Sequence, residues 1–268
     1  MNEAKGRVLI IAGSDSGGGA GIQADIKAVT MLGGYAATAI TAVTVQNTLG
    51  VTGIHPIPLD IVEAQARAVL DDIRADAIKT GMLGDIAMVE TVARILDSAP
   101  SVPAVIDPVM VAKGGSNLLA ASAVDAVRAL MIPRAGLFTP NAPEAQVLTG
   151  LPVQITDDLR RAGEALLKLG AAAVLMKGGH VEGESVVDVL MTPDGETTFE
   201  GERIHTRHTH GTGCTLASAC AAGLAQGLPL AEAVARAWAY VHEAMRQAPG
   251  FGAGHGPLDH GWLLRGKR

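Results

Sequence analysis

The stretch from His208 to Gly223, HTHGTGCTLASACAAG, places a thiol where a helix of small side chains is expected to begin. Gly211, Thr212 and Gly213 immediately precede Cys214. A turn of successive backbone N–H groups that leads into a helix forms a cradle for an anion, because those groups and the positive end of the helix face the same point. This is the strongest local signal in the chain, and it predicts an anion site.

Polar side chains follow three other runs of apolar residues that are expected to be buried strands. Lys177 comes directly after one run, where a phosphate would satisfy its charge. Asp107 ends another run, and a carboxylate in that place is costly unless it is paired or faces a site. Asn141 and Glu144 lie on one side of a helix start after a third run. Glu144 could complement the helix dipole there, or it could hold a hydrated Mg²⁺.

Further strand ends offer groups that could bind a flat ring. Gln46 presents a donor and an acceptor that suit the edge of a heterocycle, although most glutamines on loops are simply solvated. Met82 could pack against a ring, or it could fill a gap in the core. The loop from Gly13 to Gly21 could bring backbone N–H groups to a ligand, but its spacing fits no dinucleotide or Walker motif, and a flexible loop explains it equally well.

Taken together, these strand ends supply an anion cradle, a lysine, two carboxylates suited to Mg²⁺ and an amide for ring recognition. This inventory fits phosphoryl transfer from a nucleotide, in which positioning and charge neutralisation carry most of the catalysis. The alternatives are zinc or a Cys–His hydrolase. Cys214 and Cys220 are six residues apart, about 240° around a helix at ~100° per residue, so they cannot share a metal. A Cys–His pair is possible in principle, but it leaves the lysine, the carboxylates and the glycine loops without a role.

The scaffold that positions these residues follows from the hydrophobic pattern, because short apolar runs alternate with segments of helical period along the chain. Strands are expected within residues 7–13, 36–46, 76–82, 102–109, 136–141 and 172–179. Helices are expected within 21–34, 59–73, 85–99, 121–131, 142–150 and 156–170, and from about Cys214 and about Leu230. Asp60 is placed as a possible N-cap of the helix at 59–73.

Residues 186–204 break this rhythm, because two polar-alternating strands surround Asp194-Gly195, which predicts a hairpin. Near-continuous apolar strands separated by helices imply an α/β fold with a mostly parallel sheet covered on both faces. We therefore expect one domain over residues 1–268, a three-layer αβα sandwich with an antiparallel edge hairpin. Ligands of such open sheets bind beyond the carboxyl ends of the strands.

Composition excludes several classes of protein. The net charge of −6 argues weakly against a nucleic-acid partner, and no apolar stretch approaches the roughly 18 residues of a membrane span. Two cysteines cannot form a disulfide framework, and the start of the chain lacks the pattern of a signal peptide. These features favour a soluble cytoplasmic protein that binds neither nucleic acid nor membranes.

Seven segments occur in one order along the chain: GSDSGGGAGIQADIK, ITAVTVQNTLGV, KTGML, DPVMVAKGG, TPNAPEA, LMKGGH and THGTGCTL. Together they resemble the hydroxymethylpyrimidine/phosphomethylpyrimidine kinases of thiamine biosynthesis, in the ribokinase-like superfamily, from Val8 to about His260. The resemblance implies a bifunctional kinase that uses ATP and Mg²⁺. It would phosphorylate 4-amino-5-hydroxymethyl-2-methylpyrimidine and then the monophosphate, to give the diphosphate. Dimers are common in this family, so a homodimer is also implied.

The resemblance also implies roles for individual residues. Gln46 matches the glutamine that recognises the pyrimidine. The other positions assigned to the pyrimidine pocket are Gly13, Ala20, Asp25, Thr44, Met82 and Val109. Asp107 and Glu144 match the metal region, and the positions assigned to the ATP phosphates are Asn141, Lys177, Thr209 and Gly213. The segment from Gly211 to Gly213 matches the anion hole, which serves catalysis together with Lys177 and Cys214.

Cys214 stands where most ribokinase-like enzymes have the aspartate that takes the proton from the attacking hydroxyl. The cysteine agrees with the pyrimidine kinase branch. A thiol with a reference pKa of ~8.5 is mostly protonated at pH 7, but we expect the anion cradle and the helix start to lower that pKa. A loose transition state also transfers the proton late, so alignment matters more than base strength. Cys214 is therefore the candidate base, with a pocket-lining role as the alternative.

Two other functions remain open from the sequence. Pyridoxal kinase activity is the enzymatic alternative, because the same superfamily phosphorylates a similar hydroxymethyl group on pyridoxal. A non-catalytic pyrimidine-binding protein that keeps the fold is the other. The presence of Lys177, Asp107, Glu144 and the anion cradle argues against such a loss of activity.

Overall fold

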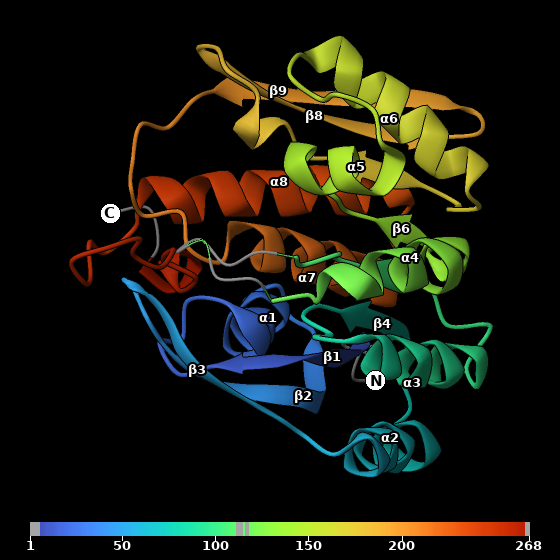
Figure 1. Cartoon of the computed structure of the whole chain (residues 1–268). Helices are drawn as coiled ribbons and strands as arrows, with labels where there is room; N and C mark the ends of the chain where they lie inside the picture. The colour runs from blue at the N-terminus through green and yellow to red at the C-terminus, as the bar shows by residue number, and fades with distance from the viewer. Residues whose placement is uncertain (1–5, 111–114, 116–117, 266–268) are drawn as a thin grey trace.

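The computed structural model describes residues 6–110, 115 and 118–265, and within them nine strands form one sheet. The strands are β1 (Arg7–Asp15), β2 (Tyr35–Asn47), β3 (Gly50–Pro56), β4 (Ala77–Thr80), β5 (Ala104–Ile106), β6 (Leu137–Phe138), β7 (Val174–Met176), β8 (Ser185–Thr192) and β9 (Gly195–Glu202). Their order across the sheet is β3-β2-β1-β4-β5-β6-β7-β8-β9 (Figure 1). Residues 111–114 of the DPVMVAKGG segment lie outside the described residues.

The strands β2, β1, β4, β5, β6 and β7 run parallel to one another, whereas β3 at one edge and β8 at the other pair antiparallel with their neighbours. The predicted hairpin is present, with β8 and β9 paired from Ser185 to Thr192 and from Gly195 to Glu202. The prediction of a mostly parallel sheet with an antiparallel edge is thus confirmed. Because parallel strands end at the same edge of a sheet, the loops after β1, β4, β5, β6 and β7 lie along one rim.

The strand β3 is a difference from the expected pattern. Gly50, Gly53 and Pro56 lower the strand propensity of this segment, so it resembles a loop in the sequence. It pairs with β2 after a short turn, in which the N–H of Leu49 donates to the Asn47 side chain at 2.8 Å. Such a turn at Asn47 is the local signal that could have identified the strand.

Helices cover both faces of the sheet, which confirms the three-layer αβα arrangement (Figure 1). They are α1 (Gly21–Met31), α2 (Leu59–Ala68), α3 (Ile86–Asp97), α4 (Val124–Ala126), α5 (Ala142–Thr149), α6 (Thr156–Lys168), α7 (Thr212–Ala225) and α8 (Leu230–Arg246). Val8 and Ile10 of β1 pack with α1, α7 and α8. Leu9 and Ile11 point to the other face and pack with residues of α2, α3, α5 and α6. No helix among the described residues is long and apolar enough to cross a bilayer.

Two helical segments depart from regular α geometry. The helix α2 continues as a π turn over Val69–Ile73, and α4 is a single turn inside a series of 3-10 and π turns that spans 121–134. Further 3-10 turns are Gly178–His180 and Trp262–Arg265. Pro58 occupies the N-cap of α2, so the expected cap at Asp60 is wrong. Asp60 lies within the first turn, where its carboxylate complements the helix dipole instead.

Candidate active site

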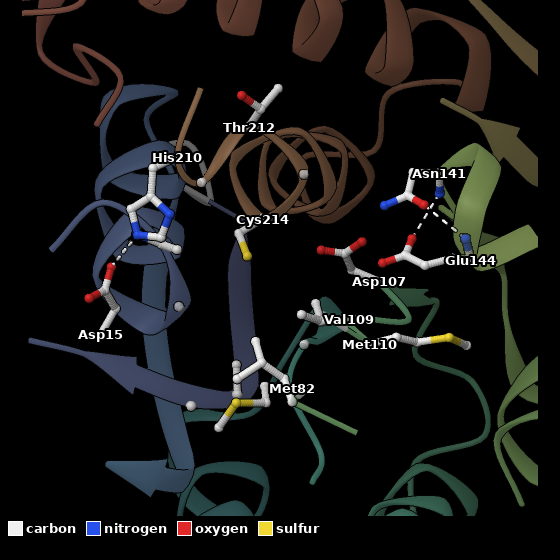
Figure 2. A pocket seen from close by; sticks show the side chains of 18 of the residues that line it. Asp15, Met82, Asp107, Val109, Met110, Asn141, Glu144, His210, Thr212 and Cys214 are labelled. Carbon is white, nitrogen blue, oxygen red and sulfur yellow. Dashed lines mark hydrogen bonds and ion pairs between the residues drawn. The ribbon is translucent and has the colours of Figure 1, made fainter. Parts of the chain in front are cut away.

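A cavity of about 490 Å³ lies at the carboxyl ends of β1, β4 and β5, next to the first turn of α7 (Figure 2). The predicted site residues that line it are Gly13, Ala20, Thr44, Gln46, Met82, Asp107, Val109, Asn141, Glu144, Lys177, Gly211, Thr212, Gly213 and Cys214. The fold therefore brings together residues from six separate strand ends. Asp25 and Thr209 are the two predicted residues that do not line this cavity.

A second cavity of about 210 Å³ adjoins the first. Lys177 and Gly213 line both cavities, so the two meet beside the anion cradle. Thr209 belongs to this second cavity. Its walls are largely apolar and aromatic, and include Val186, Leu216, Trp238, Val241 and Met245. Such walls suit a flat heterocycle, whereas the shared boundary suits a group with negative charge.

The anion cradle is the first turn of α7. Gly211 is the N-cap of this helix with φ at +84°, and a Cβ in its place would collide with the carbonyl oxygen of Gly19. Only glycine both adopts this φ readily and lacks the Cβ that would collide. The close approach of Gly19 shows that the glycine loop after β1 packs directly against the cradle. A Cβ on Gly213 would lie 3.1 Å from the Nζ of Lys177. The N–H of Thr212 donates to the carbonyl of Thr209 at 3.3 Å, and the N–H groups of Gly213 and Cys214, which have no carbonyl partner within the helix, are available to an anion beside this lysine.

Lys177 and Asp107 form an ion pair in which the Nζ–Oδ1 distance is 2.9 Å. The hydroxyl of Thr139 also lies 3.3 Å from the same carboxylate oxygen. Burial opposes the charge on Lys177, but Asp107 and Glu144 together raise the pKa of its ammonium above the usual value. The lysine therefore carries its full charge at neutral pH and is held at the boundary of the two cavities.

Glu144 and Asn141 form a capping box at the start of α5. The N–H of Glu144 donates to the Asn141 side chain at 2.9 Å, and the N–H of Asn141 donates to the Glu144 carboxylate at 2.8 Å. Burial raises the pKa of Glu144 to about 7, against the attraction of Lys177. Asp107 repels the same charge and raises this pKa further. A divalent cation would stabilise the ionised forms of both carboxylates, because it would offset the repulsion between their negative charges.

The thiol of Cys214 points into the first cavity, between the Asp107 side and the opposite wall (Figure 2). Burial raises the pKa of this thiol to about 12, and the Asp25 and Asp107 carboxylates act in the same direction. Lys79 and the backbone N–H of Gly21 favour the thiolate but do not offset these effects. The expectation that the helix start lowers the thiol pKa is therefore wrong, because the dense surroundings outweigh the helix terminus.

Asp25 does not line the first cavity, and its completely buried side chain is turned to Lys79 and Ser218 instead. Both of its carboxylate oxygens lie 2.9 Å from the Nζ of Lys79, and the hydroxyl of Ser218 donates to it at 2.7 Å. Lys79 itself lines the cavity floor. Asp25 thus supports a residue of the site from behind rather than contacting what the cavity holds.

Five polar residues of the cavity are absent from the predicted set. They are Ser14, Asp15, Lys79, His180 and His210. Asp15 sits in the glycine loop and Lys79 in the KTGML segment, so both positions at strand ends were signals in the sequence. His210 directly precedes the anion cradle, but nothing local in the sequence indicates its pairing with Asp15, 195 residues away.

No group of three or more His, Cys, Asp or Glu side chains in the described part of the chain could hold a metal ion by itself. Cys214 and Cys220 are both free thiols.

The comparisons with known proteins agree with this geometry. The sequence matches a family model described as phosphomethylpyrimidine kinase over residues 15–259. It is 49% identical over 257 residues to the hydroxymethylpyrimidine/phosphomethylpyrimidine kinase of Streptomyces coelicolor, which covers 96% of this chain and 95% of that protein. It is also 49% identical to the thiamine biosynthesis bifunctional protein ThiED of Geobacter sulfurreducens, over 96% of this chain, and spans about half (52%) of the length of that protein.

A solved structure of similar fold is the pyridoxal kinase of Staphylococcus aureus in complex with AMP-PCP and pyridoxal. The TM-score is 0.90 at 32% sequence identity, and the match covers 98% of this chain and 96% of that one. The fold is therefore similar to that of a pyridoxal kinase, whereas the sequence is more similar to the pyrimidine kinases.

Proposed function

The chain belongs to the phosphomethylpyrimidine kinase family, and from that premise we propose how its residues divide the work of the reaction. The protein is a hydroxymethylpyrimidine kinase and phosphomethylpyrimidine kinase of thiamine biosynthesis. It phosphorylates the hydroxymethyl group of 4-amino-5-hydroxymethyl-2-methylpyrimidine with ATP, and then the monophosphate to give the diphosphate. We propose that residues 1–268 form one kinase domain, since one sheet connects the described elements.

One observation carries the proposed arrangement: the two cavities meet at Lys177 and Gly213. We assign the second cavity to the base and ribose of ATP, because Trp238, Val241 and Met245 give it an apolar wall. The first cavity then receives the pyrimidine alcohol. In this arrangement the terminal phosphate of the nucleotide faces the hydroxymethyl group at the shared boundary, as phosphoryl transfer requires.

The charge of the transferred phosphoryl group is taken up at that boundary. The backbone N–H groups of the first turn of α7, from Gly211 to Cys214, are proposed to donate to its oxygens, and Lys177 supplies a positive charge. Thr209 and Asn141 are assigned to the ATP phosphates, since both line the second cavity. These groups are in place before the nucleotide binds, which lowers the cost of reorganisation during the reaction.

Asp107 and Glu144 are proposed to hold Mg²⁺. The donor set fits, because Mg²⁺ binds to one or two carboxylates and completes its coordination with water and phosphate oxygens. One oxygen of Asp107 is paired with Lys177 and one oxygen of Glu144 with the N–H of Asn141. Asp107 therefore keeps its second oxygen for a cation, whereas Glu144 is also stabilised by the backbone N–H of Met110. A bound Mg²⁺ would neutralise phosphate charge and orient the nucleotide.

The pyrimidine ring is proposed to lie between apolar contacts and a polar edge. Met82 and Val109 contact its faces, and Gly13 leaves space for Met82, because a Cβ at Gly13 would lie 2.6 Å from the Met82 methyl group. Gln46 binds the edge of the ring, with Thr44 beside its amide. Ala20 completes this pocket from the glycine loop.

Cys214 remains the proposed acceptor of the hydroxyl proton. Its support is position, since the thiol faces the first cavity next to the anion cradle. A thiol with a pKa of about 12 is protonated at neutral pH. Only the thiolate fraction can therefore accept the hydroxyl proton, and a loose transition state, in which the proton moves late, lowers the demand on base strength.

A homodimer and a cytoplasmic location are further parts of the proposal. Val43 and Val45 alternate along β2 on the face turned away from Thr44 and Gln46, and both are exposed. Exposed apolar side chains that cluster on an edge ribbon favour a protein interface, and a second copy is the partner that the family implies. The cytoplasm supplies ATP and keeps free thiols such as Cys214 reduced.

Pyridoxal kinase activity is the weaker alternative, because the sequence identity is 49% to a pyrimidine kinase and 32% to a pyridoxal kinase. The test is a steady-state assay of the purified protein with ATP, Mg²⁺ and each alcohol, with phosphorylated products identified by mass spectrometry. We expect the pyrimidine monophosphate and then the diphosphate, and a higher kcat/KM for the pyrimidine than for pyridoxal. Turnover of pyridoxal alone, or of neither alcohol, would contradict the proposal.

A further inference from the structure

The carboxylate of Asp15 is the centre of the glycine loop after β1. It is buried, and it accepts the backbone N–H groups of Gly17, Gly19 and Ala20 at 2.7, 3.0 and 2.8 Å. The fourth partner is the imidazole of His210, whose Nε2 lies 2.8 Å away. Burial opposes its ionisation, but His210 and these N–H groups hold the pKa of Asp15 below its usual value. Asp15 is therefore a carboxylate at neutral pH.

His210 is fixed on three sides. Its ring lies over Gly19, where a Cβ would collide with its Cδ2, and its backbone N–H donates to Gly256 at 3.1 Å. The side chain is 10% exposed, and it lines the first cavity. Because a carboxylate only accepts hydrogen bonds, the Nε2 of His210 must carry the proton that faces Asp15. The tautomer and the direction of this ring are thus set by Asp15.

This tautomer determines which end of the Gln46 amide, the oxygen or the nitrogen, faces His210. One end of the amide is 3.3 Å from the Nε2 of His210, and the other is 3.0 Å from the hydroxyl of Thr44. That hydroxyl is also 2.9 Å from the carbonyl oxygen of Ser14. The ends of an amide are assigned from the hydrogen-bond network. The single Nε2–H points at Asp15 at 2.8 Å, so it makes no full hydrogen bond to Gln46, but a protonated Nε2 still favours the amide oxygen over the amide NH₂ on its side. The amide NH₂ then donates to Thr44, whose one proton goes to Ser14.

In this orientation Asp15, Thr44 and the amide NH₂ each have a partner and the amide oxygen faces a protonated Nε2, whereas the reverse would set two donors against each other. We propose that the Asp15–His210 pair positions the Gln46 amide, with its oxygen toward His210 and its nitrogen toward Thr44. The amide then selects a ring that carries an amino donor beside a ring-nitrogen acceptor. This inference rests on the proposed function, and it makes His210 a positioning residue that determines specificity.

The test compares two alcohols in the full-length protein with ATP and Mg²⁺. One is the 4-amino-5-hydroxymethyl-2-methylpyrimidine, and the other is the same pyrimidine without the 4-amino group. For His210→Leu we expect the preference in kcat/KM for the amino compound to fall at least about tenfold. The reason is that an amide without a fixed orientation no longer binds the 4-amino group selectively. His210→Gln, which can place an N–H near the position of Nε2, should retain most of the preference. The KM for ATP should change little in both.

Two comparisons separate orientation from a general loss of structure. His255→Leu removes an exposed imidazole from the C-terminal segment that His210 contacts through Gly256, and it should leave the preference unchanged. In a Gln46→Leu background, His210→Leu should have no further effect on the preference, because the two residues act through one group. If His210→Leu does not fold, His210→Asn serves in its place, because its amide is too short to join Asp15 to Gln46.

The outcomes distinguish this inference from the proposed function. Equal losses of kcat/KM for both alcohols in His210→Leu would show that the histidine only supports the loop, and would overturn the inference alone. An additive effect of His210→Leu in the Gln46→Leu background would also overturn it. Wild-type protein that phosphorylates neither alcohol would remove the proposed function, and the inference would fall with it.

Discussion

The Nζ of Lys177 lies 2.9 Å from Oδ1 of Asp107, at the boundary where the two cavities meet. The pair joins the ends of β5 and β7, which are not neighbours in the sheet. Asp107 holds the ammonium in place and keeps it charged, and Gly213 leaves space for it beside the anion cradle. Under the proposed assignments, this carboxylate holds the lysine toward the nucleotide phosphate and is also one of the two proposed ligands of Mg²⁺.

Lys177→Met should lower kcat about 10²-fold or more, because the transferred phosphoryl group loses a charged donor that is already in place. The KM for ATP should rise as well. Steady-state kinetics with varied ATP measure both effects. Lys168→Met, at an exposed position at the end of α6, is the matched control and should behave as wild type. A Lys177→Met protein with wild-type kcat would remove this residue from the mechanism.

Glu144 should make the stability of the protein depend on pH. Burial raises its pKa to about 7 in the folded state, above the ordinary value of 4.5. The folded protein thus binds this proton more tightly, and the contribution is lost as pH rises from about 4.5 to about 7. Glu144→Gln keeps an acceptor for the N–H of Asn141 but does not titrate. The unfolding free energy of Glu144→Gln minus that of wild type, measured in urea without metal, should therefore increase as pH rises over this range. A difference that stays constant with pH would contradict the assignment.

The role of Cys214 can be tested by the pH dependence of kcat. A base with a pKa of about 12 should give a rate that rises roughly tenfold per pH unit near neutrality. The rate of wild type divided by that of Cys214→Ala cancels the titration of Glu144, which both proteins share. We expect this ratio to rise from pH 6.5 to 8.5, and Cys214→Asp to remove most of the rise. A Cys214→Ala protein as active as wild type would leave the thiol as a pocket wall.

The sequence was sufficient for the features that depend on strand ends. Lys177, Asp107 and the cradle before Cys214 could each be placed at the end of an apolar run, and parallel strands bring such ends to one rim. The hairpin around Asp194 was equally readable, because its polar alternation and its Asp-Gly turn are local.

Pairings through space could not be read in this way. The partner of Asp25 is Lys79, 54 residues away, and helical period alone does not distinguish a carboxylate that faces a cavity from one that faces a buried lysine. The predicted pKa of Cys214 was wrong for the same reason. The helix start favours the thiolate, but burial and two carboxylates distant in the sequence raise the thiol pKa. The sequence places His210 next to the anion cradle, but the role of this histidine depends on its contact with Asp15, which the sequence does not indicate.

The proposed dimer interface predicts an effect of charge on β2. Val45 is 63% exposed on the same face as Val43, and a lysine there would place a charge between two apolar surfaces. Val45→Lys should shift the protein from dimer to monomer in sedimentation velocity. Ile155→Lys, which charges an exposed apolar position at the start of α6, should not change the sedimentation coefficient. A wild-type protein that sediments as a monomer at micromolar concentration would end this proposal.

The Lys79–Asp25 ion pair predicts a strong asymmetry in stability, because both side chains are 0% exposed. Lys79→Met leaves the Asp25 carboxylate buried without its partner, which should cost about 3–5 kcal/mol of unfolding free energy. The double variant Lys79→Met/Asp25→Leu replaces the pair with apolar side chains and should recover most of that loss. Urea unfolding followed by circular dichroism measures all three proteins, with the exposed Arg67→Met as a control that should change little. A double variant that is no more stable than Lys79→Met would contradict this prediction. It would show that the ion pair itself stabilises the packing of α1, β4 and α7.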